Sequence, residues 1–203
     1  MAGPSHTTVA IAKKDLKPGD HIFAWRVLGL YSHHGIYVGD GQVIHFTTPQ
    51  DVLDEIAKEN PGSLIVEGLD KKTKSKRCER CGYIVGGSPG IGVMKTCIEH
   101  FAKTFHLYKY DVSWIRFWLS RRGTCCPYKS KPLEDAVKTA YAKLRTGFGK
   151  YNLLTNNCEH FATFCRTGRK FSGQVLPRRL PAGVKPEEVP IKKLEKLAAG
   201  DHI

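Results

Sequence analysis

Three residues of this sequence could together activate a thiol for attack on a carbonyl carbon: Cys158, His33 and His45. Cys158 follows Asn157, a good N-cap residue, so the cysteine falls in the first turn of a predicted helix. There the unpaired amide N–H groups and the helix dipole are expected to stabilise a thiolate and lower the pKa of the thiol. An imidazole that accepts the thiol proton completes the minimum apparatus for nucleophilic acyl transfer.

A cysteine is more often a small buried apolar residue than a nucleophile, and Cys158 must be weighed against that alternative. Phe161, Ala162 and Cys165 already supply the apolar stripe of the predicted helix. We therefore expect Cys165 in the core and Cys158 at the exposed start of the helix.

The two histidines belong to a predicted β-hairpin around Gly39-Asp40-Gly41. A two-residue turn would place His33 and His45 on opposite faces of the hairpin. A three-residue loop over 39–41 would place Gly35 opposite His45 and bring both histidines to one face, with Cα atoms roughly 7–8 Å apart. We expect the longer loop, because a glycine stands where its left-handed residue is required. Two half-buried polar side chains without a function remain the alternative.

The remaining elements must position these three side chains. Strands are predicted over 21–25, 31–38, 42–46, 64–66 and 107–112, and helices over 94–106, 132–146 and 157–167. This pattern favours an α+β fold with an antiparallel sheet packed on helices. We expect a flexible N-terminus over 1–15, a catalytic domain over 16–168 and a basic tail over 169–203. Prolines at 177, 181, 186 and 190 predict that this tail is loosely packed or extended, apart from a short amphipathic piece at 191–197.

The composition limits the class of protein. The chain has 203 residues and 41% hydrophobic content, enough for one folded domain and too much for a disordered chain. The net charge of +13 favours acidic partners, either nucleic acid or anionic lipid headgroups. The first fifteen residues carry no secretory pattern, and the least polar long stretch, 81–94, is too short to span a bilayer. We expect a soluble, cytoplasmic protein.

Seven cysteines in a chain that is expected in a reducing compartment suggest free thiols, a metal site or a nucleophile rather than disulfides. Cys78 and Cys81, in C-x-x-C spacing, could form a zinc site with Cys97 and either Cys125 or Cys126. The second half of that ligand set lacks such spacing. We therefore expect free or packed thiols, no metal and no other cofactor.

Several segments together resemble the LRAT domain, that is, the lecithin:retinol acyltransferase-like family related to the permuted NlpC/P60 thiol peptidases. They are Leu16-Lys17-Pro18-Gly19-Asp20-His21-Ile22, residues 33–41, Val43-Ile44-His45 and Asn157-Cys158-Glu159-His160-Phe161. The chain also resembles the plant branch of this family, through residues 32–35, 78–83 and 147–152. The resemblance runs from 16 to 168 and implies a permuted papain-like fold.

Matched by position, the resemblance implies that Cys158 is the nucleophile, His33 the general base and His45 the residue that orients the base. Tyr31 matches a tyrosine near the oxyanion, and His34 should point to the other face. Proteins of this family transfer an acyl chain from a phospholipid to the cysteine. They then transfer it to water, an amine, a hydroxyl or a lysophospholipid.

The resemblance implies a phospholipid substrate. In place of the apolar C-terminal anchor of vertebrate members, we expect reversible binding to an anionic membrane surface. The residues expected to bind it are Arg166, Arg169, Lys170, Arg178, Arg179 and Lys192. Two other functions stay open: a thiol peptidase or amidase of the NlpC/P60 type, and a catalytically silent lipid- or protein-binding adaptor. Nucleic acid is not expected as a partner, because no binding motif accompanies the charge.

Overall fold

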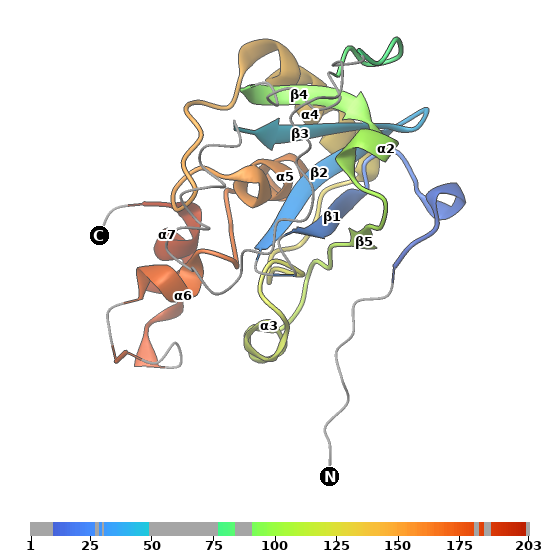
Figure 1. Cartoon of the computed structure of the whole chain (residues 1–203). Coiled ribbons are helices and arrows are strands. Elements are labelled where there is room, and N and C mark those ends of the chain that lie inside the picture. The colour runs from blue at the N-terminus through green and yellow to red at the C-terminus, as the bar shows by residue number, and fades with distance from the viewer. Residues whose placement is uncertain are drawn as a thin grey trace.

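An antiparallel sheet with helices against it forms the computed structural model of this chain (Figure 1). The structure describes residues 10–26, 29, 31–48, 77–83, 91–180, 183–184 and 188–201. The strands are β1 (His21–Arg26), β2 (Tyr31–Gly39), β3 (Gln42–Thr47), β4 (Gly92–Cys97) and β5 (His106–Leu107), in the spatial order β4-β3-β2-β1-β5. The predicted α+β class is confirmed; the strand predicted over 64–66 lies outside the described residues.

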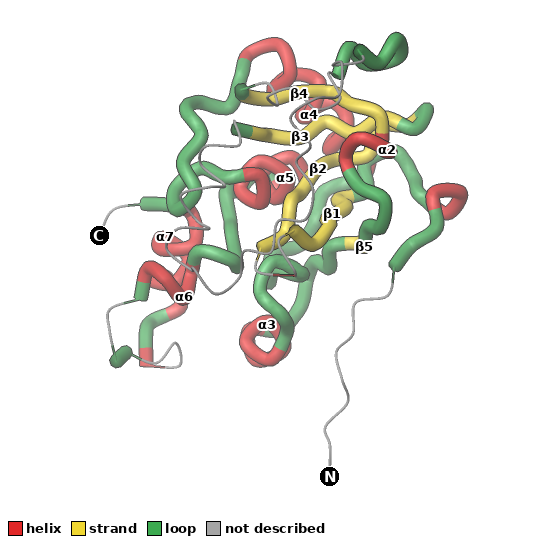
Figure 2. The backbone as a smooth tube through the Cα atoms, viewed as in Figure 1, coloured by secondary structure: helices red, strands yellow, loops and turns green. Residues whose placement is uncertain are grey.

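The described helices are η1 (Lys13–Asp15), α2 (Ile98–Phe101), α3 (Trp114–Leu119), α4 (Leu133–Thr146), α5 (Cys158–Thr167), α6 (Leu176–Arg179) and α7 (Ile191–Ala199) (Figure 2). Both α4 and α5 follow the prediction closely. The side chain of Asn157 caps α5 by accepting the N–H groups of Glu159 and His160, and Gly168 ends the helix in a left-handed conformation. Among the described residues, no helix is both long enough and apolar enough to cross a membrane.

The prediction of a helix over 94–106 is wrong. Its first part is strand β4, which pairs with β3 from Gln42–Cys97 to Thr47–Gly92, and only Ile98–Phe101 is helical. Apolar residues at three- and four-residue steps fit a helix, but this segment meets the free edge of β3. The six cross-strand pairs there outweigh the local pattern.

The hairpin between β2 and β3 has the predicted register but not the predicted loop. Gly39 pairs with Gln42, so the turn has two residues, Asp40 and Gly41, both with positive φ (50° and 66°). A register shift between Tyr37 and Gly39 then compensates for the shorter turn. Gly35 therefore still lies opposite His45, as expected.

Two apolar layers cover the two faces of the sheet. Helix α5 packs on the face that carries Ile36 and Ile44, together with α4. The other face carries Tyr37 and Val43 and packs against α2. Because side chains alternate along a strand, His33 shares the α2 face with Tyr37.

The segment after residue 168 is not the loosely packed tail that its prolines suggest. Phe171, Leu176 and Leu194 are 0–2% exposed and share one core cluster with Phe23 of β1. Pro177 stands in the first turn of α6 and Pro190 directly precedes α7, so both are at positions where a helix tolerates proline. Figure 1 shows α6 and α7 side by side.

Candidate active site

Cys158 lies beside β2 at the point where β2 and β3 separate. The pairing of β2 with β3 ends at Gly35–His45. Beyond this pair, the main chain of Ser32 makes its hydrogen bonds on this side with a side chain instead of with β3. The Gln174 side chain accepts the Ser32 N–H (2.7 Å) and donates to its carbonyl oxygen (3.1 Å). The Sγ atom of Cys158 lies 3.7 Å from the same oxygen. The nucleophile candidate is thus held against the strand that carries His33.

The thiol of Cys158 is buried, contrary to the expectation of an exposed, acidic cysteine. Its residue is 3% exposed, and burial raises the pKa of the thiol to about 11. The main-chain N–H of His34 and the hydroxyl of Tyr151 act in the opposite direction, but they do not compensate for the loss of water. The first N–H groups of α5 are directed to Asn157, which accepts from Glu159 and His160. The structure therefore contains a neutral thiol.

His33 and His45 meet on the α2 face, as predicted. Nε2 of His33 lies 2.9 Å from Nδ1 of His45, and Nε2 of His45 lies 3.1 Å from the hydroxyl of Thr96 on β4. The ring of Phe101 in α2 packs against both imidazoles. Burial lowers the pKa of His45 to about 4. The pKa of His33 is held well below 6.5, mainly by burial and to a smaller extent by electrostatic repulsion from His45. Both rings are therefore neutral at pH 7.

Two arrangements of protons satisfy this chain of contacts, and one of them leaves a free acceptor nitrogen on His33. A neutral imidazole has one N–H and one acceptor nitrogen. If His33 donates from Nε2 to Nδ1 of His45, then His45 donates from Nε2 to the Thr96 hydroxyl. Nδ1 of His33 is left as an acceptor and makes no hydrogen bond with any residue that the structure describes. That nitrogen is the one able to take a thiol proton.

The sulfur of Cys158 lies next to the main chain of the strand that carries His33, but it is not hydrogen-bonded to the His33 imidazole. Sγ of Cys158 contacts the main chain of Ser32 and of His34, on either side of His33. Within the described part of the chain, no hydrogen bond joins Sγ to a ring nitrogen of His33. Catalytic contacts are often longer in a structure without substrate and close in the reacting complex.

A pocket of about 160 Å³ opens over the two histidines. It is lined by Arg26, Tyr31, His33, His45, Thr47, Thr48, Tyr83, His100, Phe101 and Tyr151. Burial raises the pKa of Tyr31, so its hydroxyl keeps its proton and remains a hydrogen-bond donor. Arg26, which donates to the carbonyl oxygen of Phe101, brings a positive charge to the same pocket.

Sequence reasoning missed four residues that support this site. Thr96 and Tyr151 contact His45 and Cys158, respectively. Glu159, which is 0% exposed, accepts hydrogen bonds from Tyr108, Ser172, Gly173 and Gln174 and thereby holds the loop that bonds Ser32. The glutamate next to the cysteine was a local signal, since a buried acid there needs donors. Thr96 and Gln174 had no such signal.

A second histidine pair occupies the opposite face of β2, as predicted for His34. Nδ1 of His34 lies 2.9 Å from Nε2 of His21, whose Nδ1 lies 2.6 Å from the Tyr110 hydroxyl. Nε2 of His34 contacts Ser32 and Gln174. This buried hydrogen-bond network holds in place the strand segment that contacts Cys158.

One of the basic residues expected to bind membranes, Arg166, is buried. Arg166 is only 9% exposed, donates to the Lys131 carbonyl oxygen and covers the Tyr110 ring, so it belongs to the fold. Arg169 is exposed and lies over the Tyr128 ring, and the half-buried Lys170 donates to the side chain of Asn156. The side chain of Arg178 lies outside the described residues.

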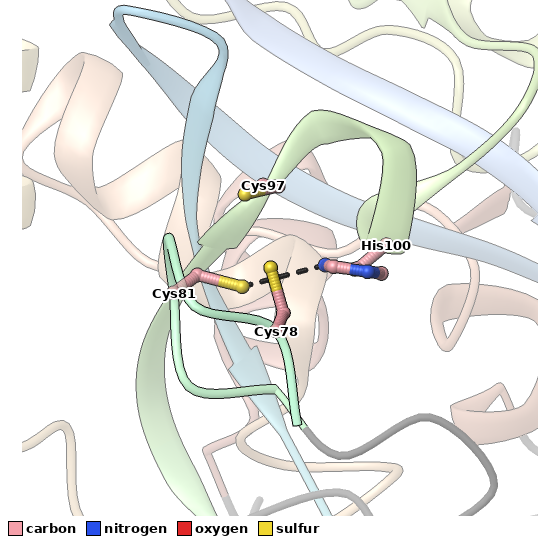
Figure 3. Close-up of side chains that lie close together, drawn as sticks. All are labelled: Cys78, Cys81, Cys97 and His100. Carbon is pink, nitrogen blue, oxygen red and sulfur yellow. Dashed lines mark hydrogen bonds between the residues drawn. The ribbon is translucent and has the colours of Figure 1, made fainter. Parts of the chain in front are cut away.

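The cysteines that lie close together are not the set expected to bind zinc. Cys125 and Cys126 are buried in the core cluster around Phe23 and do not join the others. Cys78, Cys81 and Cys97 instead converge with His100, which is not among the ligands predicted from the sequence (Figure 3). Sequence reasoning sought the fourth ligand among the cysteines and so overlooked the C-x-x-H spacing of Cys97 and His100.

The sequence of this chain is similar to those of several known proteins. A model of the lecithin retinol acyltransferase family matches residues 14–171. LEAD-SENSITIVE 1 of Arabidopsis thaliana is 38% identical over 160 residues, covering 77% of this chain and 60% of that protein. Phospholipase A and acyltransferase 4 of Homo sapiens is 28% identical over 179 residues, covering 87% and 85%. Lecithin retinol acyltransferase of Rattus norvegicus is 28% identical over 145 residues, covering 71% and 52%. The chain thus matches 60% or less of the length of the plant and rat relatives.

Proposed function

Because this chain belongs to the lecithin retinol acyltransferase family, we propose that it transfers an acyl chain from a phospholipid onto Cys158 and from there to an acceptor. The family match confirms the resemblance drawn from the sequence. Relatives named for phospholipase A and acyltransferase activity support a lipid ester as the substrate. The hydrogen-bonded series His33–His45–Thr96 carries the proposal, because one of its two proton arrangements leaves Nδ1 of His33 free as a base beside the strand that Cys158 contacts.

The proposed first step forms a thioester. The Sγ–H proton of Cys158 passes to Nδ1 of His33 while sulfur attacks the ester carbonyl carbon. The carbon–oxygen bond of the ester then breaks, and the lysophospholipid alkoxide takes the proton from His33. Because the resting thiol is neutral, proton transfer accompanies attack. His45 stabilises the imidazolium by accepting from its Nε2.

The second step releases the acyl chain. Water, an amine or a lysophospholipid hydroxyl loses its proton to His33 and attacks the thioester carbonyl, and the thiolate leaves and is reprotonated. The N–H of Cys158 and the hydroxyl of Tyr31 are the donors proposed for the oxyanion in both steps. Arg26 lies in the same pocket and supplies the charge to bind the phosphate of the headgroup.

Reversible binding to anionic membranes is proposed through the basic residues that remain available, including Lys192, which is exposed on α7. Lipid vesicles with and without phosphatidylserine, each at low and high salt, test this in a sedimentation assay. Binding that needs the anionic lipid and weakens with salt supports it, because such attraction is screened. Equal sedimentation with both vesicles contradicts it.

The central experiment is intact-protein mass spectrometry after incubation with mixed phospholipid vesicles. An acyl-sized mass increment that maps to Cys158, is removed by neutral hydroxylamine and is absent from Cys158→Ala supports the proposal. No increment, together with slow turnover of a peptide or amide substrate, would favour the peptidase alternative. Neither increment nor turnover of either substrate would favour the adaptor.

A further inference from the structure

We propose that Cys78, Cys81, Cys97 and His100 form a structural zinc site that fastens residues 77–83 to the wall of the candidate active site. Three thiolates and one imidazole are a ligand set that zinc takes in structural sites. No cofactor was expected from the sequence, so this inference replaces that expectation. It rests on these four side chains and is independent of the acyl-transfer proposal.

The ligand atoms lie close enough together for a tetrahedral site. Their four ligand atoms all lie within 4.8 Å of one another, and Sγ of Cys81 is 3.3 Å from Nδ1 of His100. With Zn–S bonds of about 2.3 Å, tetrahedral geometry separates two sulfurs by ~3.8 Å and a sulfur from a nitrogen by ~3.6 Å. Figure 3 shows the side chains pointing into one common space from two segments of the chain. Small side-chain adjustments are enough to admit the ion.

Both segments are built to present their ligands in pairs. Cys78 and Cys81 flank a tight turn in which Gly82 donates to the Cys78 carbonyl oxygen (2.8 Å) and has a φ of +71°. The main-chain N–H groups of Arg80 and Cys81 point to the sulfur of Cys78, as donors to a metal-bound thiolate would. Glycine suits the left-handed position that closes this turn.

The second pair spans the junction of β4 and α2. Cys97 is the last residue of β4 and the N-cap of α2, and His100 lies on the first turn of that helix. The two residues are three apart, like Cys78 and Cys81, so each segment supplies a pair with x-x spacing. Cys97 is 2% exposed, which places the ion at the edge of the core.

The site adjoins the candidate active site. The ring of Tyr83 stacks on that of His100 (centroids 4.8 Å apart), and both residues line the pocket over His33 and His45. Phe101, which packs against both of these histidines, directly follows His100 in α2. An ion held here would fix Tyr83 and the start of α2 relative to the pocket.

The test measures metal in the full-length protein, purified under reducing conditions, reconstituted with zinc and dialysed against a chelator. We expect one zinc ion per wild-type chain. The zinc content per chain should fall about tenfold or more in Cys78→Ser and in His100→Ala. Cys125→Ala is the matched control, because Cys125 is a buried cysteine outside the cluster, and it should keep its zinc. A wild-type chain without zinc, or a Cys125→Ala variant that loses as much as Cys78→Ser, would overturn the site.

Cobalt substitution of the wild-type chain keeps the proposal testable even if a variant fails to fold. Co²⁺ bound by three thiolates and a histidine should show thiolate-to-metal charge-transfer absorption and the intense visible bands of tetrahedral coordination, and zinc should displace it. Absence of these bands would contradict the ligand set. Neither measurement depends on acyl transfer, so the zinc site and the proposed function can fail separately.

Discussion

The Sγ atom of Cys158 lies 3.7 Å from the main-chain carbonyl oxygen of Ser32, the residue directly before His33. The β2–β3 pairing ends at Gly35–His45, so on this side the main chain of Ser32 bonds to the Gln174 side chain instead of to β3, while on the other side Ser32 pairs with Trp25 of β1. A helix start and a strand far apart in the sequence are thereby brought together. The relationship explains why the thiol is buried and neutral while still adjacent to the residue proposed as its base.

Replacing Cys158 by alanine should abolish acyl transfer and leave the fold intact. The sulfur accepts the N–H of His34, so its removal costs about 1–3 kcal/mol for an unpaired buried donor, which a stable domain survives. Activity assays with circular dichroism and thermal melting check this. Cys165→Ala, which truncates a buried cysteine of the same helix, should lose stability but keep activity. An unfolded Cys158→Ala would instead assign Cys158 a packing role.

His33→Gln should reduce kcat about 10²–10⁴-fold, because glutamine cannot accept and return the proton. His45→Gln should reduce kcat less, since His45 acts only by orienting the base and stabilising its charged form. Steady-state kinetics of both variants over a range of pH give the comparison. Wild-type activity in His33→Gln would rule out His33 as the base.

Thr96→Val tests the end of the histidine chain. Valine has the shape of threonine but cannot accept the N–H of His45, and a buried donor left unpaired costs about 1–3 kcal/mol. We expect a lower midpoint of thermal unfolding and a decrease in kcat of up to about tenfold. Thr96→Ser restores the hydroxyl and should recover most of both losses. Equal behaviour of the two variants would show that the hydroxyl is not the relevant group.

The reactivity of the Cys158 thiol should increase with pH throughout the neutral range. Its pKa is about 11, so the thiolate fraction at pH 7 is small and grows tenfold per pH unit up to that value. Iodoacetamide labelling followed by peptide mapping measures the rate at Cys158 from pH 6 to 10. A rate that is already constant below pH 7 would reveal a thiolate–imidazolium pair instead.

The protein should lose stability as the pH falls below about 6.5. Burial lowers the pKa of His45 to about 4 and that of His160 to about 3, so the folded state keeps both rings neutral. Between about 6.5 and these values the unfolded chain binds protons that the folded chain does not, which costs about 1.4 kcal/mol per pH unit for each ring. Urea unfolding from pH 7.5 to 5 should show a falling midpoint. A constant midpoint would contradict this assignment.

Local patterns in the sequence predicted much of the site. The cap at Asn157, the stop at Gly168 and the paired strands around Asp40 each depend on neighbours within a few residues, and the structure has them all. The prediction that the two histidines share one face is confirmed, but the three-residue loop from which it follows is wrong. A shorter turn and a compensating register shift gave the register that a longer loop had been expected to give.

The sequence by itself determined which side chains could do chemistry here, because residue type and short-range spacing carry that information. Only the tertiary structure decided their environment: the buried neutral sulfur of Cys158, Thr96 behind His45, His100 among the cysteines, and Phe171 docked in the core. These features arise from contacts between segments far apart along the chain. The loss of water and the electrostatic field at a side chain depend on what surrounds it in space, and no local pattern encodes that.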